Sequence, residues 1–584
     1  MNILGLNAYH GDVSAVLLQN GKLVAAIEEE RFRRIKHWAG CPRDSVIACL
    51  KMAGIGPRDI DHFAVSRNPK ANLARKAMFM ARRRPSLATV ADRVKNSVRV
   101  QDLATRLAEN LGLERQAVER KMHWIEHHPA HLSSAFFVSP FDQAAVCAID
   151  GFGDFVSTSF AVGRGASLDV IQRVFFPHSL GLLYLAITQY LGFMKFGDEF
   201  KVMGLAPYGK PSFADQLRRL RKLKPDGLFE LDLDYFCHWS DAVPMKWDDG
   251  EPTLGRVFTP KLEQLLGSPA RTPKDPLAER HEDIAASLQL VHEEAVFHLL
   301  KELYHRTKLP NLCLAGGCAM NSVANGKIRE HTPFERVYIQ PAAGDNGTSL
   351  GAAYYVWNQL LGQPRAFSME HGYWGPEFGE AAIEQALTKR QSDIAAQNCQ
   401  SKKICNQDEL CCWTAERISE GKVVGWFQGR MEWGARALGN RSIVADPRRA
   451  DMREIINTKI KFREKFRPFA PSVAEDALND YFVGGCPDPF MIQVYPVRPE
   501  KRGIIPAVTH VDGSGRLQTV SAQSNPLYYK LIKTFASLTG VPVLLNTSFN
   551  ENEPIVHTPE EALDCFLRTH MDHIVLGHYT VSKA

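Results

Sequence analysis

The sequence predicts a duplicated α/β fold followed by a further α/β region, and three observations support this prediction. Residues 2–29 alternate short apolar runs with turns, and residues 145–176 repeat the same plan. Each repeat opens with an apolar strand that leads into an acidic turn, which holds Asp12 in the first and Asp150 in the second. Glycine and proline residues at 362–376 then separate the repeats from another series of strands and helices.

The first repeat is expected to form three strands: Ile3–Leu6, Ser14–Leu18 and Leu23–Ile27. Asn20-Gly21 lies between the last two, and this pair favours a tight hairpin because both residues accept a positive φ. Residues 43–120 are expected to be mainly helical. Within them, the stretch Lys70–Arg99 is strongly basic, and it is either a solvated helical face or a surface for an anionic substrate or partner.

The second repeat is also expected to form three strands: Val146–Ile149, Ser157–Val162 and Val170–Phe176. Helices follow to about residue 305, and Leu312–Ala315 is then a buried strand that enters a glycine pair and a helix. Val337–Gln340 is a further short strand. The C-terminal region shows its clearest strands at Val423–Phe427 and Val541–Leu545.

Length and composition indicate a globular protein. The chain has 584 residues, enough for more than one domain, with 45% apolar and 23% charged residues. The net charge of +5 suits an anionic small substrate without indicating nucleic acid. The N-terminal residues do not resemble a signal peptide, and no apolar run reaches the roughly 18 residues that cross a bilayer. We therefore expect a cytoplasmic protein whose twelve cysteines, which include no Cys-x-x-Cys pair, are reduced.

Two histidines and two aspartates form the first candidate site. His127 and His131 are four residues apart, so on a helix both imidazoles share one face and can bind one divalent cation. A lone pair of this kind is more often without a metal, and a single Asp in a turn is often only a turn former. Asp150 and Asp345, however, both follow apolar strands and lie in glycine-rich turns. Together the four residues predict a mixed nitrogen and oxygen site suited to Fe, Zn or Mn.

A glycine pair forms the second candidate site. Gly316 and Gly317 follow the buried strand and precede a helix that begins near Asn321. Such a turn lets a nucleotide approach the backbone, although the segment lacks the Gly-x-x-x-x-Gly-Lys-Ser/Thr pattern of a phosphate-binding loop. A tight strand-to-helix turn without a ligand remains the alternative.

A C-terminal group of cations is the third candidate site. Arginines and glycines alternate between Gly429 and Ser442, and basic residues recur from Lys459 to Arg467. Arg516 and the segment Asn546–Asn550 follow. Because arginine binds phosphate through two parallel N–H groups and Asn and Ser add donors, we expect an anion pocket here rather than a solvated face.

In this order, these segments resemble the antibiotic- and nodulation-type carbamoyltransferases, the NodU/CmcH family of O-carbamoyltransferases. The resemblance covers nearly the whole chain. The residues that carry it are Gly5–Ala8 with Asp12, Glu28–Phe32 with Lys36-His37, His127-x-x-x-His131, Asp150-Gly151, Pro177–Tyr184, Gly197–Pro207, Gly316-Gly317 with Asn321, Gly344-Asp345, Arg430–Ser442, Arg467–Pro471, His510–Asp512 with Arg516, and Leu545–Asn550.

The resemblance implies a fold and a reaction. Residues 1–365 are similar to a duplicated actin-like ATPase (ASKHA, TsaD-like) domain that transfers the carbamoyl group. Residues 372–584 are similar to a YrdC-like α/β domain that forms carbamoyl adenylate from carbamoyl phosphate and ATP, and the last strand is open to assignment with either domain. Transfer inside one protein protects this reactive intermediate from water.

The resemblance also implies roles for individual residues. His127, His131, Asp150 and Asp345 are expected to hold the metal, with Fe(II) or another divalent cation bound, and Mg²⁺ accompanies ATP. The nucleotide or carbamoyl adenylate is expected at Glu199, Lys201, Gly316, Gly317 and Asn321. Carbamoyl phosphate and ATP are expected at Arg436, Arg441, Lys461, Arg467, Arg516, Asn546 and Ser548. The catalytic residues are expected to be His10, Asp12 and Lys36.

One departure from the family pattern concerns His10. The family writes this turn as His-Asp-Ser/Ala-Ala, whereas here Gly11 separates His10 from Asp12. His10 is either the base that deprotonates the acceptor hydroxyl or a residue displaced from that role. The expected partners are carbamoyl phosphate, ATP and a hydroxyl-bearing small molecule such as a secondary metabolite or sugar, with a homodimer allowed and neither membrane nor nucleic acid expected. A tRNA threonylcarbamoyl-type transferase and a non-catalytic nucleotide-binding protein are the alternative functions.

Overall fold

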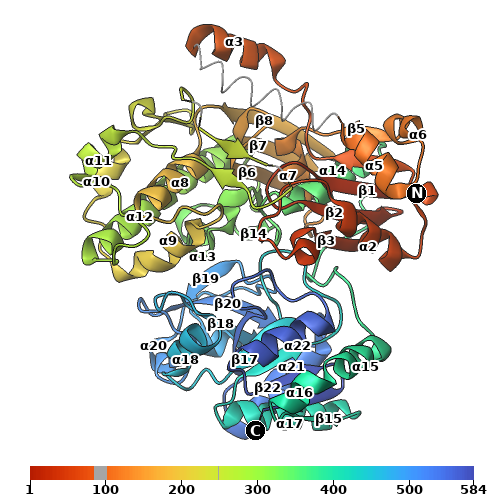
Figure 1. Cartoon of the computed structure of the whole chain (residues 1–584). Coiled ribbons are helices and arrows are strands. Elements are labelled where there is room, and N and C mark those ends of the chain that lie inside the picture. Colours follow the sequence, from red (N-terminus) through yellow and green to blue (C-terminus); the bar gives the residue numbers. More distant parts are fainter. Residues whose placement is uncertain (84–101, 242, 248, 584) are drawn as a thin grey trace. The chain divides into compact units, whose positions relative to one another are not determined.

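The computed structural model describes residues 1–83, 102–241, 243–247 and 249–583. The chain divides into two compact units, Met1–Met369 and Glu370–Ala584, and each is an α/β unit with mixed sheets (Figure 1). All twelve cysteines are free. Among the described residues, no helix has the length and apolarity needed to cross a bilayer.

The first sheet of unit 1 has the order β3-β2-β1-β4-β5. Its strands are β1 (Asn2–Asn7), β2 (Ser14–Gln19), β3 (Lys22–Glu28), β4 (His62–Val65) and β5 (Met122–Trp124). The predicted hairpin is present, since Asn20 and Gly21 join β2 to β3 with φ values of 48° and 76°. β1 pairs antiparallel with β2 and parallel with β4, so the ends of β1 and β4 lie at the same edge of the sheet.

The second sheet of unit 1 repeats this arrangement with the order β14-β13-β6-β7-β8. Its strands are β6 (Gln143–Gly153), β7 (Val156–Arg164), β8 (Ser167–Phe175), β13 (Asn311–Ala315) and β14 (Arg336–Ile339). β6 pairs antiparallel with β7 and parallel with β13, as β1 does with β2 and β4. The expected end of β6 at Ile149 was wrong, because the strand continues past Asp150 with a shift in register between Ile149 and Gly153.

Two central helices lie between these sheets: α7 (His127–Phe136) and α14 (Asn346–Tyr354). Every residue of both helices is buried. α14 packs on β1 and β2, α7 packs on β6 and β13, and the two helices pack on each other. A Cβ atom on Gly351 would lie 1.7 Å from the carbonyl oxygen of Ala130, so only glycine allows this close approach.

Further helices cover unit 1. They are α1 (Glu30–Arg33), α2 (Arg43–Ala53), α3 (Leu73–Arg83), α5 (Leu103–Leu111), α6 (Arg115–Arg120), α8 (Leu180–Tyr190), α9 (Glu199–Leu205), α10 (Ala214–Arg218), α11 (Pro260–Leu266), α12 (Glu279–Thr307) and α13 (Ser322–His331). α2 packs on β2 and β3, while α8 and α12 pack on β6. The predicted basic stretch Lys70–Arg99 is described as far as Arg83, and its remaining residues lie outside the described part of the chain.

Unit 2 is built on a nine-stranded sheet with the order β15-β23-β22-β16-β17-β21-β18-β20-β19. The strands are β15 (Gln400–Lys403), β16 (Val424–Phe427), β17 (Arg441–Ala445), β18 (Ala470–Ala474), β19 (Gln493–Pro496), β20 (Ser514–Val520), β21 (Val543–Ser548), β22 (His573–Leu576) and β23 (Tyr579–Ser582). The main helices are α15 (Glu380–Lys389), α17 (Gln407–Ser419), α18 (Met452–Lys459), α21 (Pro526–Thr539) and α22 (Pro559–Arg568). The last strand, β23, pairs with β15 and β22 and therefore belongs to this unit.

A candidate metal centre and an arginine cluster

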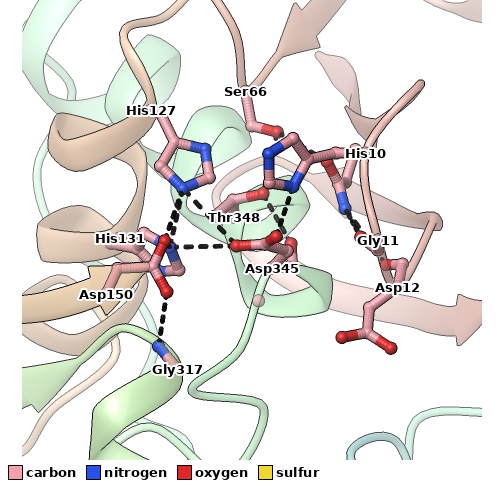
Figure 2. Close-up of polar contacts among 12 residues, drawn as sticks. His10, Gly11, Asp12, Ser66, His127, His131, Asp150, Gly317, Asp345 and Thr348 are labelled. Carbon is pink, nitrogen blue, oxygen red and sulfur yellow. Dashed lines mark hydrogen bonds and ion pairs between the residues drawn. The ribbon is translucent and has the colours of Figure 1, made fainter. Parts of the chain in front are cut away.

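Four side chains that are far apart in the sequence converge in unit 1. The first turn of α7 provides His127 and the next turn His131, both on one face of the helix. Asp150 comes from β6, and Asp345 immediately precedes α14. All four are buried, and one ligand atom from each lies within 4.8 Å of the others (Figure 2). We call these four residues the metal centre.

The separations within the metal centre suit a bound cation. His127 Nε2 lies 3.1 Å from His131 Nε2 and 3.2 Å from Asp150 Oδ2, and Asp345 Oδ1 lies 3.4 and 3.3 Å from the two histidine nitrogens. The pair His131 Nε2 and Asp150 Oδ2 is wider, at 3.8 Å. A metal bonded at about 2.1 Å places neighbouring ligand atoms about 3.0–3.4 Å apart in octahedral or tetrahedral geometry. Asp345 Oδ1 is buried and makes no hydrogen bond within the described chain, as expected of an atom that faces a cation.

The charges of the side chains in the metal centre also favour a bound cation. Burial alone would lower the pKa of His127, but Asp150 and Asp345 raise it to about 10, so the two carboxylates favour positive charge at this position. Burial opposes ionisation of both carboxyls, yet His127 and His131 hold the pKa of Asp150 well below its usual range. His10, together with these two histidines, does the same for the pKa of Asp345. Two imidazoles and two carboxylates are a donor set for Fe, Zn or Mn.

A set of backbone and hydroxyl contacts holds these ligands in position. The amide of Gly317 donates to Asp150 Oδ1 at 2.9 Å. The hydroxyl of Thr348 donates to the carbonyl of Asp345 at 2.6 Å and contacts Ser66 Oγ at 2.8 Å (Figure 2). Hydrogen bonds of this kind, from groups that do not themselves bind the metal, fix the orientation of metal ligands.

The three expected catalytic residues lie in different surroundings. His10 Nδ1 contacts Asp345 Oδ2, so this histidine reaches the metal centre despite its displaced position, and its ring stacks on Trp247 at 4.9 Å. Asp12 faces away from the metal centre and accepts a hydrogen bond from His37 Nδ1 at 2.7 Å. Burial would lower the pKa of His37, but Asp12 raises it to about 9. Lys36 is exposed beside His37.

The residues expected at the nucleotide form two groups within unit 1. Gly316 has a φ of 91°, and a Cβ there would lie 2.3 Å from the carbonyl of Ile149, so the turn requires glycine. Asn321 caps α13 and exchanges amide hydrogen bonds with Gln289. Lys201 Nζ lies 2.9 Å from Asp198 Oδ1 at the start of α9, and burial raises the pKa of the neighbouring Glu199 to about 7.

Four arginines of unit 2 lie near one another, and we call them the arginine cluster: Arg436, Arg463, Arg467 and Arg516. Burial lowers the pKa of Arg516, and the positive charges of the other three lower it further. The buried carboxyl of Asp488 is the opposing charge that acts on Arg516 and Arg436. Burial raises the pKa of Asp488 to about 7, which weakens its ability to balance the arginines. Clustered cations that repel one another are stabilised by a bound anion.

The remaining residues expected at this anion pocket have internal partners. Arg441 is fully buried, stacks on Phe427 at 3.6 Å and donates to the backbone carbonyls of Pro376, Gln428, Gly429 and Asn440. Lys461 Nζ donates to the carbonyls of Ser548 and Asn550. Asn546 is also buried and donates to Ala437, Ser472 and Gln518. These placements show Arg441 and Asn546 bonded to the protein itself.

The structure adds residues that the sequence reasoning did not assign to a site. Asp154 Oδ2 accepts hydrogen bonds from the amides of His127 and Asn68, at 3.0 and 2.8 Å. Asp154 is the last residue of the acidic turn that begins at Asp150. A second aspartate in this turn was the only sign in the sequence that the residue could belong to a site. Arg463 lies within the predicted basic run but was not distinguished from its neighbours. Nothing in the local sequence of Ser66 pointed to a site.

Comparisons with known proteins identify the family. The family model described as "Carbamoyltransferase N-terminus" matches residues 2–354, and "Carbamoyltransferase C-terminus" matches residues 415–583. An uncharacterized protein of Synechocystis is 41% identical and covers 100% of this chain and 97% of its own length. Nodulation protein NolNO of Sinorhizobium fredii is 38% identical over 99% of this chain and 80% of its own length. The solved structure of T. kodakarensis HypF is 15% identical over 62% of this chain and 48% of its own, with a TM-score of 0.31. Since both family models match and the relatives align over the full chain, this protein belongs to the carbamoyltransferase family and is a carbamoyltransferase enzyme.

Proposed function

We propose that the protein is an ATP-dependent O-carbamoyltransferase with two chemical centres. In unit 2, carbamoyl phosphate and ATP form carbamoyl adenylate and pyrophosphate. In unit 1, the carbamoyl group moves from the adenylate to a hydroxyl of a small-molecule acceptor, a secondary metabolite or a sugar, and AMP leaves. We further propose that the two similar sheets of unit 1 are the halves of an actin-like ATPase domain of the TsaD type, and that unit 2 is YrdC-like.

The observation that carries this proposal is the contrast between the two centres. Unit 1 gathers two imidazoles and two carboxylates, a donor set for a cation. Unit 2 gathers four arginines, and the buried carboxyl of Asp488, whose pKa is raised to about 7, opposes the charges of Arg516 and Arg436. Glu464 pairs with Arg467 at 3.7 Å. A site of the second kind suits the phosphates of carbamoyl phosphate and ATP, with Mg²⁺ accompanying the nucleotide. Arg436, Arg467 and Arg516 are the proposed phosphate ligands, and Lys461 and Ser548 are proposed as further residues of this site.

Unit 1 supplies binding and proton transfer for the second step. His127, His131, Asp150 and Asp345 would hold Fe(II) or another divalent metal, and a bound cation supplies positive charge that polarises oxygen atoms in the site. The turn at Gly316 and Gly317 lets the adenylate approach the backbone, with Glu199, Lys201 and Asn321 around it.

We propose that His10 is the base that accepts the proton of the acceptor hydroxyl. Its Nδ1 is engaged by Asp345 Oδ2, and a carboxylate on one ring nitrogen orients the imidazole so that the other nitrogen can accept a proton. The stacking of its ring on Trp247 keeps the imidazole in this orientation. Asp12 acts on His37 rather than on His10, so its proposed contribution, like that of Lys36, is to the charge around the transfer site.

The purified protein, ATP, carbamoyl phosphate and a panel of hydroxylated metabolites test this proposal. The expected result is pyrophosphate release that requires carbamoyl phosphate, followed by a mass gain of one carbamoyl group on one class of acceptor. The control omits ATP and should give neither product. Pyrophosphate release without carbamoyl phosphate, or carbamoylation that does not depend on ATP, contradicts the proposal.

A further inference from the structure

A tripeptide that follows β4, Ser66 to Asn68, contacts residues that support the metal centre and His10. Ser66 Oγ lies 2.8 Å from the hydroxyl oxygen of Thr348, which donates to the carbonyl of Asp345. The amide of Asn68 donates at 2.8 Å to Asp154 Oδ2, the atom that also receives the amide of His127. Arg67 stands between these two residues.

Arg67 itself is tied to the loop that carries His10. Its Nη1 donates to the carbonyl of Tyr9 at 3.0 Å, and Tyr9 directly precedes His10. The three consecutive residues therefore contact the supports of Asp345, His10 and His127 respectively. This placement puts a guanidinium beside the reacting centre, close enough for the charges of Asp154 and Asp345 to act on it.

Most N–H donors of the Arg67 guanidinium have no hydrogen-bond partner among the described residues. Within the described residues, the bond to Tyr9 is its single hydrogen bond, and no carboxylate lies within ion-pair distance. Asp154 is the carboxylate whose charge acts most strongly on Arg67, yet its Oδ2 already accepts two backbone amides. Arginine carries five N–H donors in a fork, so most of this fork is open to a ligand. Burial disfavours the charge of Arg67, and an anionic ligand would offset that cost.

We propose that Arg67 is a further catalytic residue, which donates hydrogen bonds to a negatively charged oxygen of the carbamoyl adenylate while it reacts. This inference rests on the function proposed above. In the step, the acceptor oxygen bonds to the carbamoyl carbon, and its proton goes to the base. The bond from that carbon to the phosphate oxygen breaks, and AMP leaves with the electron pair. Negative charge appears on the carbamoyl oxygen and on the departing phosphate, and a guanidinium fork matches either.

Single-turnover transfer from enzyme-bound carbamoyl adenylate tests the role of Arg67. Arg67→Gln should slow transfer about 100- to 1,000-fold, the effect of removing a donor to a developing oxyanion, while Arg67→Lys should recover part of the rate. Arg58→Gln is the matched control, because Arg58 is an exposed arginine of the same half of unit 1. Adenylate formation should be equal in all four proteins.

Two further measurements separate this role from the alternatives. The metal content of Arg67→Gln should equal that of the wild type, whereas a structural support of the metal centre would lose metal in proportion to rate. Added AMP should inhibit Arg67→Gln less than the wild type if the fork binds the phosphate, and equally if it binds the carbamoyl oxygen. If the wild type transfers the carbamoyl group and Arg67→Gln does so at the same rate, the role of Arg67 is overturned while the proposed function stands. A loss of rate in Arg67→Gln that is proportional to loss of metal has the same consequence. Absence of transfer in the wild type overturns the proposed function instead.

Discussion

One glycine beside the metal centre permits a sharp test of its geometry. A Cβ added to Gly153 would lie 2.2 Å from two ring carbons of His127 and 2.7 Å from its Nε2. Gly151, two residues earlier in the same strand, has no atom within 4 Å of the corresponding position. Neither glycine has a positive φ, so alanine is acceptable to the backbone at both. Gly153→Ala and Gly151→Ala are thus a matched pair that differ in contact with the ligand.

The size of the expected effect follows from these distances. Carbon atoms pack at about 3.5 Å or more, so the imidazole of His127 must move by about 1 Å in Gly153→Ala. Metal–nitrogen bonds tolerate about 0.2 Å, and a displaced ligand therefore leaves the cation. We expect at least a 10- to 100-fold loss of metal affinity, comparable to the loss of a supporting contact. Overpacking should also lower stability by about 1–3 kcal/mol.

The assay is the metal content of each purified variant, measured by mass spectrometry after dialysis against a series of free metal concentrations. Circular dichroism shows whether each variant is folded. Gly151→Ala should retain the metal content of the wild type, and folded Gly153→Ala should be depleted. Equal metal affinity in the two variants would refute the assignment of His127 as a ligand.

Three other substitutions probe the remaining structure. Arg516→Met removes a charge-assisted donor worth about 1.5–3 kcal/mol, so the KM for carbamoyl phosphate should rise about 10- to 150-fold with stability unchanged. An unchanged KM would exclude Arg516 from the anion site. Arg441→Met removes the donor to four backbone carbonyls, of which those of Gln428 and Asn440 are buried, so urea unfolding should show a loss of about 3 kcal/mol, and normal stability would contradict this role. Burial raises the pKa of Glu199 to about 7, so the folded protein binds this proton more tightly than the unfolded chain, and the contribution of Glu199 to stability falls as pH rises from about 4.5 to 7. Glu199→Gln should therefore raise Tm relative to the wild type at pH 8 and not at pH 4.5, and an equal difference at both would contradict the raised pKa of this carboxyl.

Local patterns in the sequence predicted what depends on neighbouring residues. The Asn20-Gly21 hairpin is present as expected. The four-residue spacing of His127 and His131 placed both imidazoles on one face of α7. Asp150 and Asp345 were chosen because each follows an apolar run expected to be a strand. In the structure, both carboxylates lie close to the two histidines.

Long-range packing decided what the sequence could not. His10 meets Asp345 across 335 positions of the chain, and the local departure at Gly11 gave no sign of it. Arg441 and Arg516 look alike in a run of basic residues. The structure separates them, because Arg441 lies at the start of the central strand β17 among backbone carbonyls, whereas Arg516 lies with other arginines. The position of an arginine within the sheet, rather than its residue type, decides whether its guanidinium is available to bind an anion.

The central claim is that activation and transfer belong to different centres, and His127→Ala tests it most directly. Both partial reactions are measured on one preparation: pyrophosphate release dependent on carbamoyl phosphate, and carbamoyl transfer to the acceptor. The metal centre should be needed for transfer alone, so His127→Ala should release pyrophosphate at the wild-type rate and fail to carbamoylate. An equal loss of both partial reactions would contradict the assignment of the two steps to separate centres.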